Sequence, residues 1–430
     1  MKASIATAKP APSLWRASTS NAFASPTLEA QVTTDVVIIG GGYSGLSAAL
    51  HLAQQGVDVR LLEAHDIGFG GSGRNVGLVN AGLWLPPDQV EAQLGLQAGR
   101  KLNQALAAAP DLVFKLIEQH QMDCQPVRNG TLHCANNRAG VADLKRRLAQ
   151  QQKRHAPVQL LDASTVKTRT GSSQFTGALF DPRAGTIQPL EYAFGLAHAA
   201  VAAGAYIYTQ SPALSYQHDG NQWCVTTATG SISANQLILA TNAYDLNLTA
   251  TPHHTPVHFC QFATQPLSPQ QRASILPQGE GCWDTAKVMS SFRLDNEARL
   301  IIGGVGCVED AGKQTHLNWA HRQLKALFPQ VTDYQFEYAW SGCIAMTPDH
   351  LPKMAHLGPQ AVSLYGYSGR GIGPATVLGK AAAQWAMGAD PASLPVAITL
   401  PKADYFAPIK AHYYNTGARL AHWVGRRLGE

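Results

Sequence analysis

The segment from Val36 to Glu63 constrains the fold of this chain most, because it places a strand, a glycine-rich turn, a helix and a second strand in one short stretch. A buried-strand run, Val36–Ile39, leads directly into Gly40-Gly41-Gly42-Tyr43-Ser44-Gly45. Apolar spacing predicts a helix over Ser44–Gln55 and a strand over Val57–Glu63. The GxGxxG pattern alone is weak evidence, but this context predicts a dinucleotide-binding βαβ unit.

Each glycine of this turn has a distinct expected role. Gly40 permits the tight turn, Gly42 lets the backbone approach a pyrophosphate, and Gly45 lets helix and strand pack closely. The helix N-terminus offers free N–H groups to the phosphates. Glu63 stands 18 positions after Gly45 and is expected to accept hydrogen bonds from a ribose diol. The alternative is a glycine-rich turn without a ligand.

Two further glycine-rich loops favour FAD over NAD. The run Ile67–Asn75 follows Glu63 closely, and its Ser72 and Arg74 can donate to phosphate or flavin oxygens. The loop Gly366–Gly373 precedes a helix in which Pro374 is expected at the first position. The N-terminus of that helix would direct partial positive charge at a reduced flavin. Taken alone, each loop also fits an ordinary turn, and a NAD-binding module stays the alternative.

The distribution of expected elements predicts a mixed α/β fold: a Rossmann-like FAD-binding domain with an inserted mixed or antiparallel-sheet substrate domain. Residues 1–33 are expected to form an N-terminal arm, and residues 34–120, 180–255 and 336–400 a discontinuous FAD-binding domain. Residues 121–179 and 256–335 are assigned to the substrate domain, and 401–430 to a C-terminal helical tail. Leu214–Val225 and Ser231–Ala240 are expected as strands, and Val288–Leu294 with Arg299–Gly303 as a hairpin.

Composition indicates a globular protein and narrows its partners. Charged residues make up only 14% of the chain and the formal charge is +5, which is weak evidence for nucleic acid. The seven scattered cysteines favour reduced thiols in a cytoplasmic protein and argue against a zinc site. No stretch is long enough for a membrane span. The amphipathic Ala418–Leu428 is expected to dock on the protein, with peripheral membrane contact as the alternative.

In their order along the chain, these motifs resemble the D-amino-acid-oxidase-like FAD-dependent oxidoreductases. The resemblance rests on Val36–Leu46, Gly68–Asn75, Ala240–Tyr244, Trp340–Gly342 with Thr347–Asp349, and Gly366–Gly373. Within that family the chain is similar to the gamma-glutamylputrescine oxidoreductase branch and, around Gly70–Asp88, to bacterial L-pipecolate oxidases. The resemblance implies hydride transfer from a small amine or amino acid to flavin N5. Many relatives have histidine where this chain has Arg370.

The residues expected to bind the cofactor come from all of these segments. They are Gly40, Gly42, Tyr43, Ser44, Gly45, Glu63, Ala64, Gly71, Ser72, Arg74, Asn75, Val76, Gly77, Leu78, Ala240, Thr241, Gly342, Gly369, Arg370, Gly371, Ile372 and Gly373. FAD is expected to be held without a covalent bond.

An amino-acid substrate needs a cation for its carboxylate, and arginine suits this best. Arg370 is the first candidate, with Arg293 and Arg183 as others, and a surface salt bridge is the alternative role of each. Trp84 and Trp340 could wall the pocket and His258 could line it, although core packing fits these three equally well. The expected activity is therefore oxidation of a carbon–nitrogen bond, with L-pipecolate or gamma-glutamylputrescine as substrate and oxygen or a quinone as electron acceptor. A structural, non-catalytic FAD is the alternative from a different class.

Overall fold

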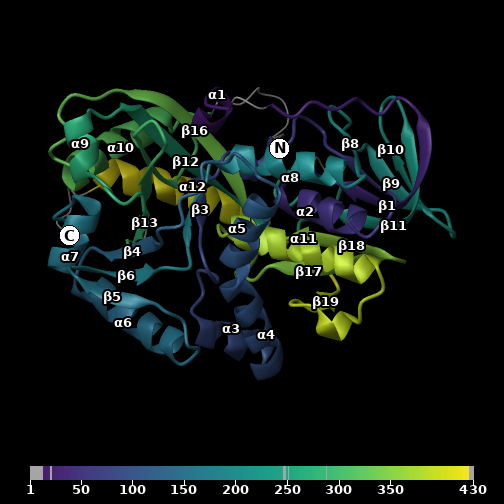
Figure 1. Cartoon of the computed structure of the whole chain (residues 1–430), viewed down its shortest axis with the longest axis horizontal. Coiled ribbons are helices and arrows are strands. Elements are labelled where there is room, and N and C mark those ends of the chain that lie inside the picture. The colour runs from purple at the N-terminus through teal and green to yellow at the C-terminus, as the bar shows by residue number, and fades with distance from the viewer. Residues whose placement is uncertain (1–12, 20–21, 246–247, 250, 287, 426–430) are drawn as a thin grey trace.

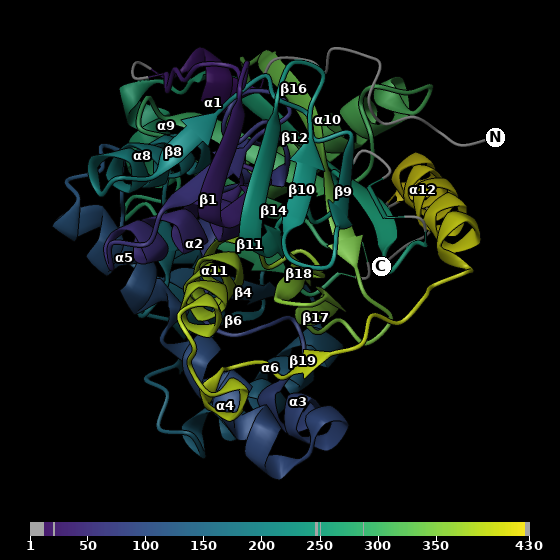
Figure 2. The same cartoon turned by 90° about the vertical axis from the view of Figure 1, so that its right-hand side faces the viewer.

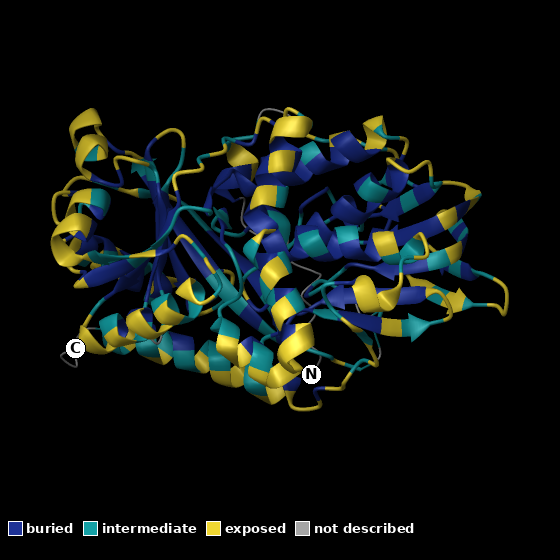
Figure 3. Cartoon of the chain, turned by 60° about the horizontal axis from the view of Figure 1, so that its bottom comes forward, coloured by how far each residue is buried: buried dark blue, intermediate teal, exposed yellow. Residues whose placement is uncertain are grey.

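The computed structural model describes residues 13–19, 22–245, 248–249, 251–286 and 288–425. These residues form two large β-sheets side by side, each covered by helices, with a third group of helices between them (Figure 1). Strands fill the interior, and exposed positions gather on the outer turns of the helices and on loops (Figure 3). This arrangement agrees with the mixed α/β class predicted from the sequence.

The first sheet has nine strands, and its centre is parallel. Its main path runs β19 (Ile398–Thr399), β17 (Lys353–Gly358), β18 (Ala361–Tyr365), β11 (Ser231–Leu239), β1 (Gln31–Ile39), β2 (Val59–Leu62) and β8 (Tyr206–Tyr208). The stretch expected as one strand over Leu214–Val225 is instead a hairpin of β9 (Ser215–His218) and β10 (Trp223–Thr226), which pairs with β11. The central strands are buried because helices cover the sheet.

Three helices pack on this first sheet: α2 (Tyr43–Ala53), α8 (Pro189–Ala202) and α11 (Ile372–Ala386). The approach of α11 to α2 is close, since a Cβ at Gly379 would lie 2.3 Å from the backbone oxygen of Ser44. Both helices therefore bring their N-termini to the same edge of the sheet, where β1 and β18 end. Ligands bind outside the carboxyl ends of parallel strands in folds of this kind.

The second sheet has eight strands in the order β16 (Phe336–Met346), β12 (Thr255–Pro266), β15 (Arg299–Val305), β14 (Ser291–Leu294), β13 (Gly281–Asp284), β4 (Thr131–Ala135), β6 (Gly177–Asp181) and β5 (Gln159–Asp162). All pairs are antiparallel except β13 with β4. The expected hairpin is present as β14 and β15. The helices that accompany the second sheet are α6 (Arg138–Gln152), α7 (Ala163–Thr170), α9 (Pro269–Ser274) and α10 (Lys313–Leu327). Its core is separate from that of the first sheet.

Between the sheets lie α3 (Pro87–Leu94), α4 (Leu96–Ala107) and α5 (Ala109–Gln119), which correspond to the mostly helical stretch expected over Gln89–His120. A two-stranded ribbon of β3 (Leu78–Val79) and β7 (Gly185–Thr186) joins the two halves. The sheet pairing moves two expected domain boundaries. β16 begins at Phe336 but pairs with β12, so it belongs to the second sheet, and β6 crosses the expected boundary at residue 180.

The described part of the N-terminal arm is anchored rather than irregular. The short helix α1 (Leu14–Ala17) buries Leu14 and Trp15 almost completely. The indole nitrogen of Trp15 donates to the carbonyl of Asn75 over 2.8 Å, and its ring meets that of Trp340 edge-on at 6.0 Å between centroids. The arm therefore braces the loop that follows β2.

The C-terminal helix α12 (Ala407–Val424) packs on β12 and α10. Its contact residues include Ala418 and His422, both buried, whereas Leu420 and Trp423 are exposed. The helix lies at the outside of the molecule (Figure 2). The rest of the expected amphipathic stretch, residues 426–428, lies outside the described residues. No described helix has the length and apolarity that a membrane crossing requires.

Candidate active site

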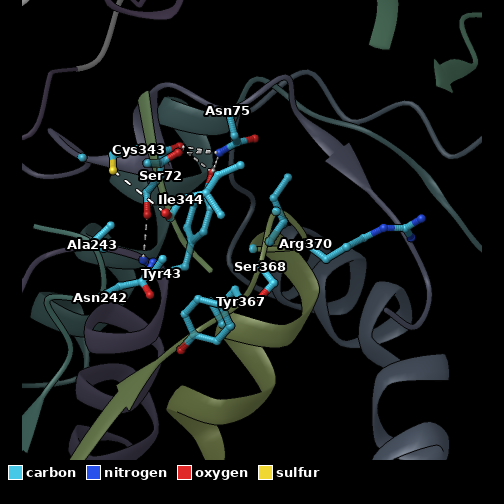
Figure 4. A pocket seen from close by; sticks show the side chains of 18 of the residues that line it. Tyr43, Ser72, Asn75, Asn242, Ala243, Cys343, Ile344, Tyr367, Ser368 and Arg370 are labelled. Atoms are coloured by element: carbon cyan, nitrogen blue, oxygen red, sulfur yellow. Dashed lines mark hydrogen bonds between the residues drawn. The ribbon is translucent and has the colours of Figure 1, made fainter. Parts of the chain in front are cut away.

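A cavity of about 720 Å³ lies between the two sheets and is lined by residues from both. That size falls in the range of roughly 300–1,000 Å³ that is usual for small-molecule and cofactor sites. One end is formed by the turn after β1, the end of β2 and the segment after β11. The other end is formed by the second sheet, α3, α6 and the loop before α11 (Figure 4).

At the first end, the N-terminus of α2 opens into the cavity. Its cap residue is Gly42, which has no side chain to cap the helix. The N–H of Tyr43 donates to the Ser72 hydroxyl, and the following N–H groups of the first turn are available to an anion. Gly45 does not line the cavity; a Cβ there would lie 2.0 Å from the carbonyl oxygen of Gly40, so its role is close packing. Glu63 does line it, and its carboxylate accepts hydrogen bonds from the N–H groups of Gly41 (2.7 Å) and His65 (2.9 Å).

The loop after β2 is held in shape by Asn75. Its side-chain amide donates to the carbonyls of Gly71 and Ser72 and to the hydroxyl of Tyr43, and its Oδ1 accepts from the N–H of Gly77. The hydroxyl of Ser72 accepts from the N–H of Tyr43 over 3.2 Å (Figure 4). These contacts fix the loop beside the N-terminus of α2, where a threaded cofactor would pass.

The loop before α11 supplies the far end of the cavity. Helix α11 begins at Ile372 with Gly371 as its uncapped N-cap residue. Pro374 is therefore the third helical residue, and its expected place at the first position is wrong. The helix starts two residues earlier because the glycine-rich loop can itself enter the helical turn. Like α2, α11 directs an uncapped N-terminus and its partial positive charge into the cavity.

Arg370 extends from this loop away from the other labelled side chains (Figure 4). Its guanidinium lies over two indoles that meet edge-on, 4.5 Å from the ring centroid of Trp84 and 4.7 Å from that of Trp283, which is on β13 of the second sheet. Its Nη1 reaches the carbonyl of Ala81 at 3.4 Å, and its Nε has no partner. No carboxylate of the described residues is within salt-bridge distance of it. Burial, and then the nearby Arg147, lower the pKa of Arg370 to about 9.

Most of the predicted cofactor residues lie on the cavity wall: Gly40, Gly42, Tyr43, Ser44, Glu63, Ala64, Gly71, Ser72, Asn75, Val76, Leu78, Ala240, Thr241, Gly369, Arg370, Gly371, Ile372 and Gly373. Trp84 lies there as well. Gly45, Arg74, Gly77 and Gly342 do not, and neither do Arg293, Trp340 and His258.

Three arginines that were expected at the site make hydrogen bonds or an ion pair within the protein instead. Arg293 is buried, and its Nη1 donates to the carbonyls of Val76, Gly77 and Ile187 at 2.6–3.4 Å, so this side chain is held away from the cavity in which a substrate carboxylate is expected. Burial lowers its pKa to about 10. Arg74 donates to the carbonyls of Phe69 and Ser341, which leaves it turned away from the cavity. Arg183, the third candidate, pairs with Asp181 at 2.6 Å.

The remaining expected residues have packing roles. Trp340 is fully buried and donates its Nε1–H to the carbonyl of Arg74 over 2.8 Å, so it braces the loop instead of walling the pocket. His258 is on β12, next to the cavity-lining Phe259, and faces the other side. A Cβ at Gly342 would lie 2.4 Å from the Phe259 ring, and one at Gly77 would lie 2.3 Å from the carbonyl oxygen of Ile187. Neither position has room for a side chain, so both require glycine.

The second sheet contributes residues that the sequence patterns did not single out. Gln261, Ser291 and Trp283 line the cavity from β12, β14 and β13, and Asn80 lines it after β3. The ring of His133 stacks on Trp283 at 5.1 Å, and burial lowers its pKa to about 3. Gln261 did leave a signal, since it is the one polar residue within the short run Phe259–Ala263. The others become neighbours only through strand pairing.

These features fit FAD. Two uncapped helix N-termini open into one cavity, and a carboxylate stands at the end of β2 at one end of it. Gly42 leaves the backbone of the turn open, since a Cβ there would meet only the hydroxyl of Ser72, at 3.0 Å. The donor set suits phosphates near Gly42, a ribose near Glu63 and a flavin ring toward Arg370.

Comparisons with known proteins agree with this geometry. Residues 35–385 match the FAD dependent oxidoreductase family. The gamma-glutamylputrescine oxidoreductase of Escherichia coli (strain K12) is 32% identical over 355 residues, which are 80% of this chain and 82% of that protein. A probable oxidoreductase, OrdL, of Haemophilus influenzae is 31% identical over 376 residues, 86% of each chain.

Solved structures show the same fold. The glycine oxidase of Geobacillus kaustophilus superposes with a TM-score of 0.68 at 22% identity, covering 83% of this chain and 95% of its own. The L-proline dehydrogenase of P. horikoshii superposes with a TM-score of 0.70 at 19% identity, covering 92% of this chain and 99% of its own. The chain belongs to the D-amino-acid-oxidase-like family of FAD-dependent oxidoreductases, which act on the carbon–nitrogen bonds of amines and amino acids.

Proposed function

We propose that this enzyme oxidises a small cyclic secondary amino acid, with L-pipecolate as the first candidate. The substrate loses a hydride from the carbon next to nitrogen and a proton from nitrogen, so that a C=N bond forms and an imine is released. FAD supplies the hydride acceptor, its N5 atom. Oxygen or a quinone then takes the electrons. The residues of the chain bind and orient the substrate and keep water away from the reacting carbon.

The observation that carries this proposal is the unpaired guanidinium of Arg370 in the cavity. Arg370 is partly buried. A cation that lacks a carboxylate partner in such a place is costly, and a ligand carboxylate would relieve that cost. The two indoles beside it meet edge-on at 6.1 Å between centroids and make no hydrogen bond to the guanidinium, so they do not use its donors. A carboxylate bound there would lie beside the loop before α11, at the end of the cavity where the flavin ring is expected.

The apolar walls favour a compact ring. Trp84, Trp283 and Ile344 present large apolar surfaces to this end of the cavity, which suits methylene groups better than a long polar chain. These walls also exclude water, as hydride transfer requires.

The second candidate is gamma-glutamylputrescine, the substrate named for a relative that is 32% identical. Its glutamyl group also carries a carboxylate, so Arg370 does not discriminate between the two. The reacting nitrogen would then lie many atoms from the carboxylate, whereas in a cyclic amino acid it is two bonds from the carboxyl carbon. Relative turnover of the two compounds therefore decides between them.

The test is anaerobic reduction of the bound flavin by L-pipecolate, L-proline, sarcosine and gamma-glutamylputrescine. We expect L-pipecolate to bleach the flavin fastest. Arg370→Leu should raise the KM for it roughly 10- to 100-fold, because a hydrogen bond to a charged group contributes about 1.5–3 kcal/mol. Arg128→Leu is the control, since Arg128 is a solvated partner of Asp111. Failure of every cyclic amino acid to reduce the flavin overturns the proposal.

The same material tests the expected non-covalent linkage. Cys343 lines the cavity, and burial raises the pKa of its thiol to about 12, which disfavours the nucleophilic thiolate. Acid precipitation should therefore leave all flavin in the supernatant. Flavin that stays with the precipitated wild-type protein but not with Cys343→Ser contradicts this expectation.

We further propose that α12 contacts a membrane surface. Five exposed apolar or aromatic residues follow one another at intervals of three, four, seven and three positions, so they share a helix face. They are Phe406, Ile409, Tyr413, Leu420 and Trp423. Such a stripe with Trp and Tyr, together with basic and no acidic residues in α12, suits the interface of an anionic membrane.

Sedimentation with vesicles of anionic and zwitterionic lipid tests this contact. Serine at both Leu420 and Trp423 should abolish co-sedimentation with anionic vesicles. Tyr206→Ser, at an exposed aromatic residue on β8, is the control. Equal recovery of wild type and the double variant in the pellet contradicts the contact.

A further inference from the structure

Three residues that line the cavity each carry a buried polar atom that lacks a partner. Among the described residues, nine buried side-chain nitrogen and oxygen atoms make no hydrogen bond. Three of them belong to residues that line the cavity: Arg370 Nε, Trp283 Nε1 and Gln261 Oε1. The first two are donors and the third is an acceptor. Unsatisfied buried polar atoms are destabilising, so their clustering on one cavity wall points to a ligand that completes them.

The acceptor, Gln261, sits in a position shaped for its side chain. It lies on β12, which is paired on both sides, and is only 3% exposed. Gly303 stands opposite it on β15, and a Cβ at Gly303 would lie 2.1 Å from the Gln261 Oε1. Any other residue at 303 would displace the amide. Gly303 therefore keeps room for the amide of Gln261 against the sheet.

Strand register places this acceptor and the donors along one line across the sheet. Gln261 pairs with Gly303, Gly303 with Ser291, and Ser291 with Trp283. The backbones of Gln261 and Trp283 are three strand spacings apart, about 14 Å. Their side chains project from the same face into the cavity, and Arg370 stacks on Trp283 at the donor end. A ligand between them meets donors at one end and an acceptor at the other.

We propose that Gln261 Oε1 accepts a hydrogen bond from the N–H of the substrate amine, while the carboxylate is bound at the Arg370 and Trp283 end. This inference rests on the proposed oxidation of an amino acid. An amide oxygen orients the nitrogen without a negative charge, so it does not hold the amine in its protonated form. Hydride loss needs the neutral amine, and a carboxylate at this position would oppose it.

The first test separates the N–H contact from packing. Wild-type enzyme should reduce its flavin about 100-fold more efficiently with L-pipecolate than with N-methyl-L-pipecolate, which has no N–H in its neutral form. In Gln261→Leu, which keeps the volume of the side chain, the preference should shrink to a few-fold. Gln236→Leu is the matched control, because Gln236 also has a buried, unpartnered Oε1 but lies on β11 away from the cavity.

A second readout does not depend on turnover. Tetrahydropyran-2-carboxylate keeps the ring and the carboxylate but replaces N–H by an oxygen, which would face the Gln261 Oε1 unfavourably. Its dissociation constant, measured from the perturbation of the flavin spectrum, should be at least as low in Gln261→Leu as in wild type. Weaker binding to the variant overturns the inference.

A third variant tests the charge argument. Gln261→Glu adds a negative charge that stabilises the ammonium, so the pH midpoint of flavin reduction by L-pipecolate should move upward by about one unit or more. An unchanged midpoint, or a full N–H preference in Gln261→Leu, overturns the role of Gln261 but not the proposed function. If none of the amino acids reduces the wild-type flavin, it is the proposed function that fails.

Discussion

The guanidinium of Arg370 lies over the ring of Trp283, 4.7 Å from its centroid, and the Nε of the one and the Nε1 of the other have no hydrogen-bond partner. Residues from a loop of the first sheet and a strand of the second thus meet as a pair of stacked, unsatisfied donors. Because neither is completed within the described protein, the pair supports the proposed site for a carboxylate, which has two acceptor atoms.

Trp283→Phe should weaken carboxylate binding about 3- to 10-fold. The phenyl ring keeps the stack under Arg370 but removes the Nε1–H, whose hydrogen bond contributes about 1 kcal/mol. The measurement is the dissociation constant of tetrahydropyran-2-carboxylate from flavin absorbance. Trp223→Phe is the control, since that indole donates to the carbonyl of Pro359 outside the cavity. Unchanged affinity in Trp283→Phe would show that the indole N–H does not face the ligand.

Gly42→Ala should lose FAD while the protein stays folded. A Cβ at Gly42 would meet only the Ser72 hydroxyl, so the fold tolerates it, but the methyl group would occupy the path of the pyrophosphate. We expect at least a tenfold weaker FAD affinity, measured as flavin bound per protein after dialysis. Gly417→Ala, in open space on α12, should keep its full flavin content. Full occupancy in Gly42→Ala would place the phosphates elsewhere.

Arg293→Leu should destabilise the enzyme by about 3 kcal/mol or more. The substitution leaves the buried carbonyls of Val76, Gly77 and Ile187 without their donor. The checks are the urea midpoint and the KM of the folded fraction, which should equal that of wild type. Arg272→Leu, at an exposed position on α9, should change neither. A large rise in KM with unchanged stability would return Arg293 to the substrate site.

His422→Leu should make the enzyme less sensitive to acid. Burial, and then His316 with its Nδ1 2.7 Å away, lower the pKa of His422 to about 3. Since the unfolded chain binds this proton near pH 6.5, stability from neutral His422 is complete above that pH and is lost as pH falls toward 3, by up to about 1.4 kcal/mol per unit. The melting temperature should therefore drop less between pH 7.5 and 5 in the variant. The control is His412→Leu, on the exposed side of α12; equal drops in all three proteins would contradict the prediction.

The cofactor half of the site was predictable because its chemistry is local. Gly40, Gly42 and Glu63 belong to one strand–turn–helix–strand segment, and all three line the cavity together with residues of the loops around Ser72 and Arg370. The loop of Arg370 was recognisable from its glycines, although the start of α11 was misplaced by two residues. Short-range pattern is sufficient wherever the ligand contacts the backbone of a turn or a helix N-terminus.

The substrate half was not predictable in this way. Arg293 and Arg370 both stand in plausible positions in the sequence. Arg293 donates to three backbone carbonyls, whereas Arg370 lines the cavity. Sequence patterns do not tell these apart, because the difference lies in which loops pack against each side chain. Likewise, Trp340 and Trp84 are both tryptophans beside glycine-rich segments, but Trp340 is sealed against the Trp15 ring.

The sequence by itself determined the βαβ unit of Val36–Glu63, the FAD chemistry of three glycine-rich loops and the mixed α/β class, because backbone geometry and periodicity encode these within a few residues. Only the tertiary structure decided that β16 joins the second sheet, that Arg370 stands unpaired over two indoles, and that Gln261 shares a register row with Trp283. These depend on pairing between strands that are distant in the chain, where packing and hydrogen bonding choose the neighbours.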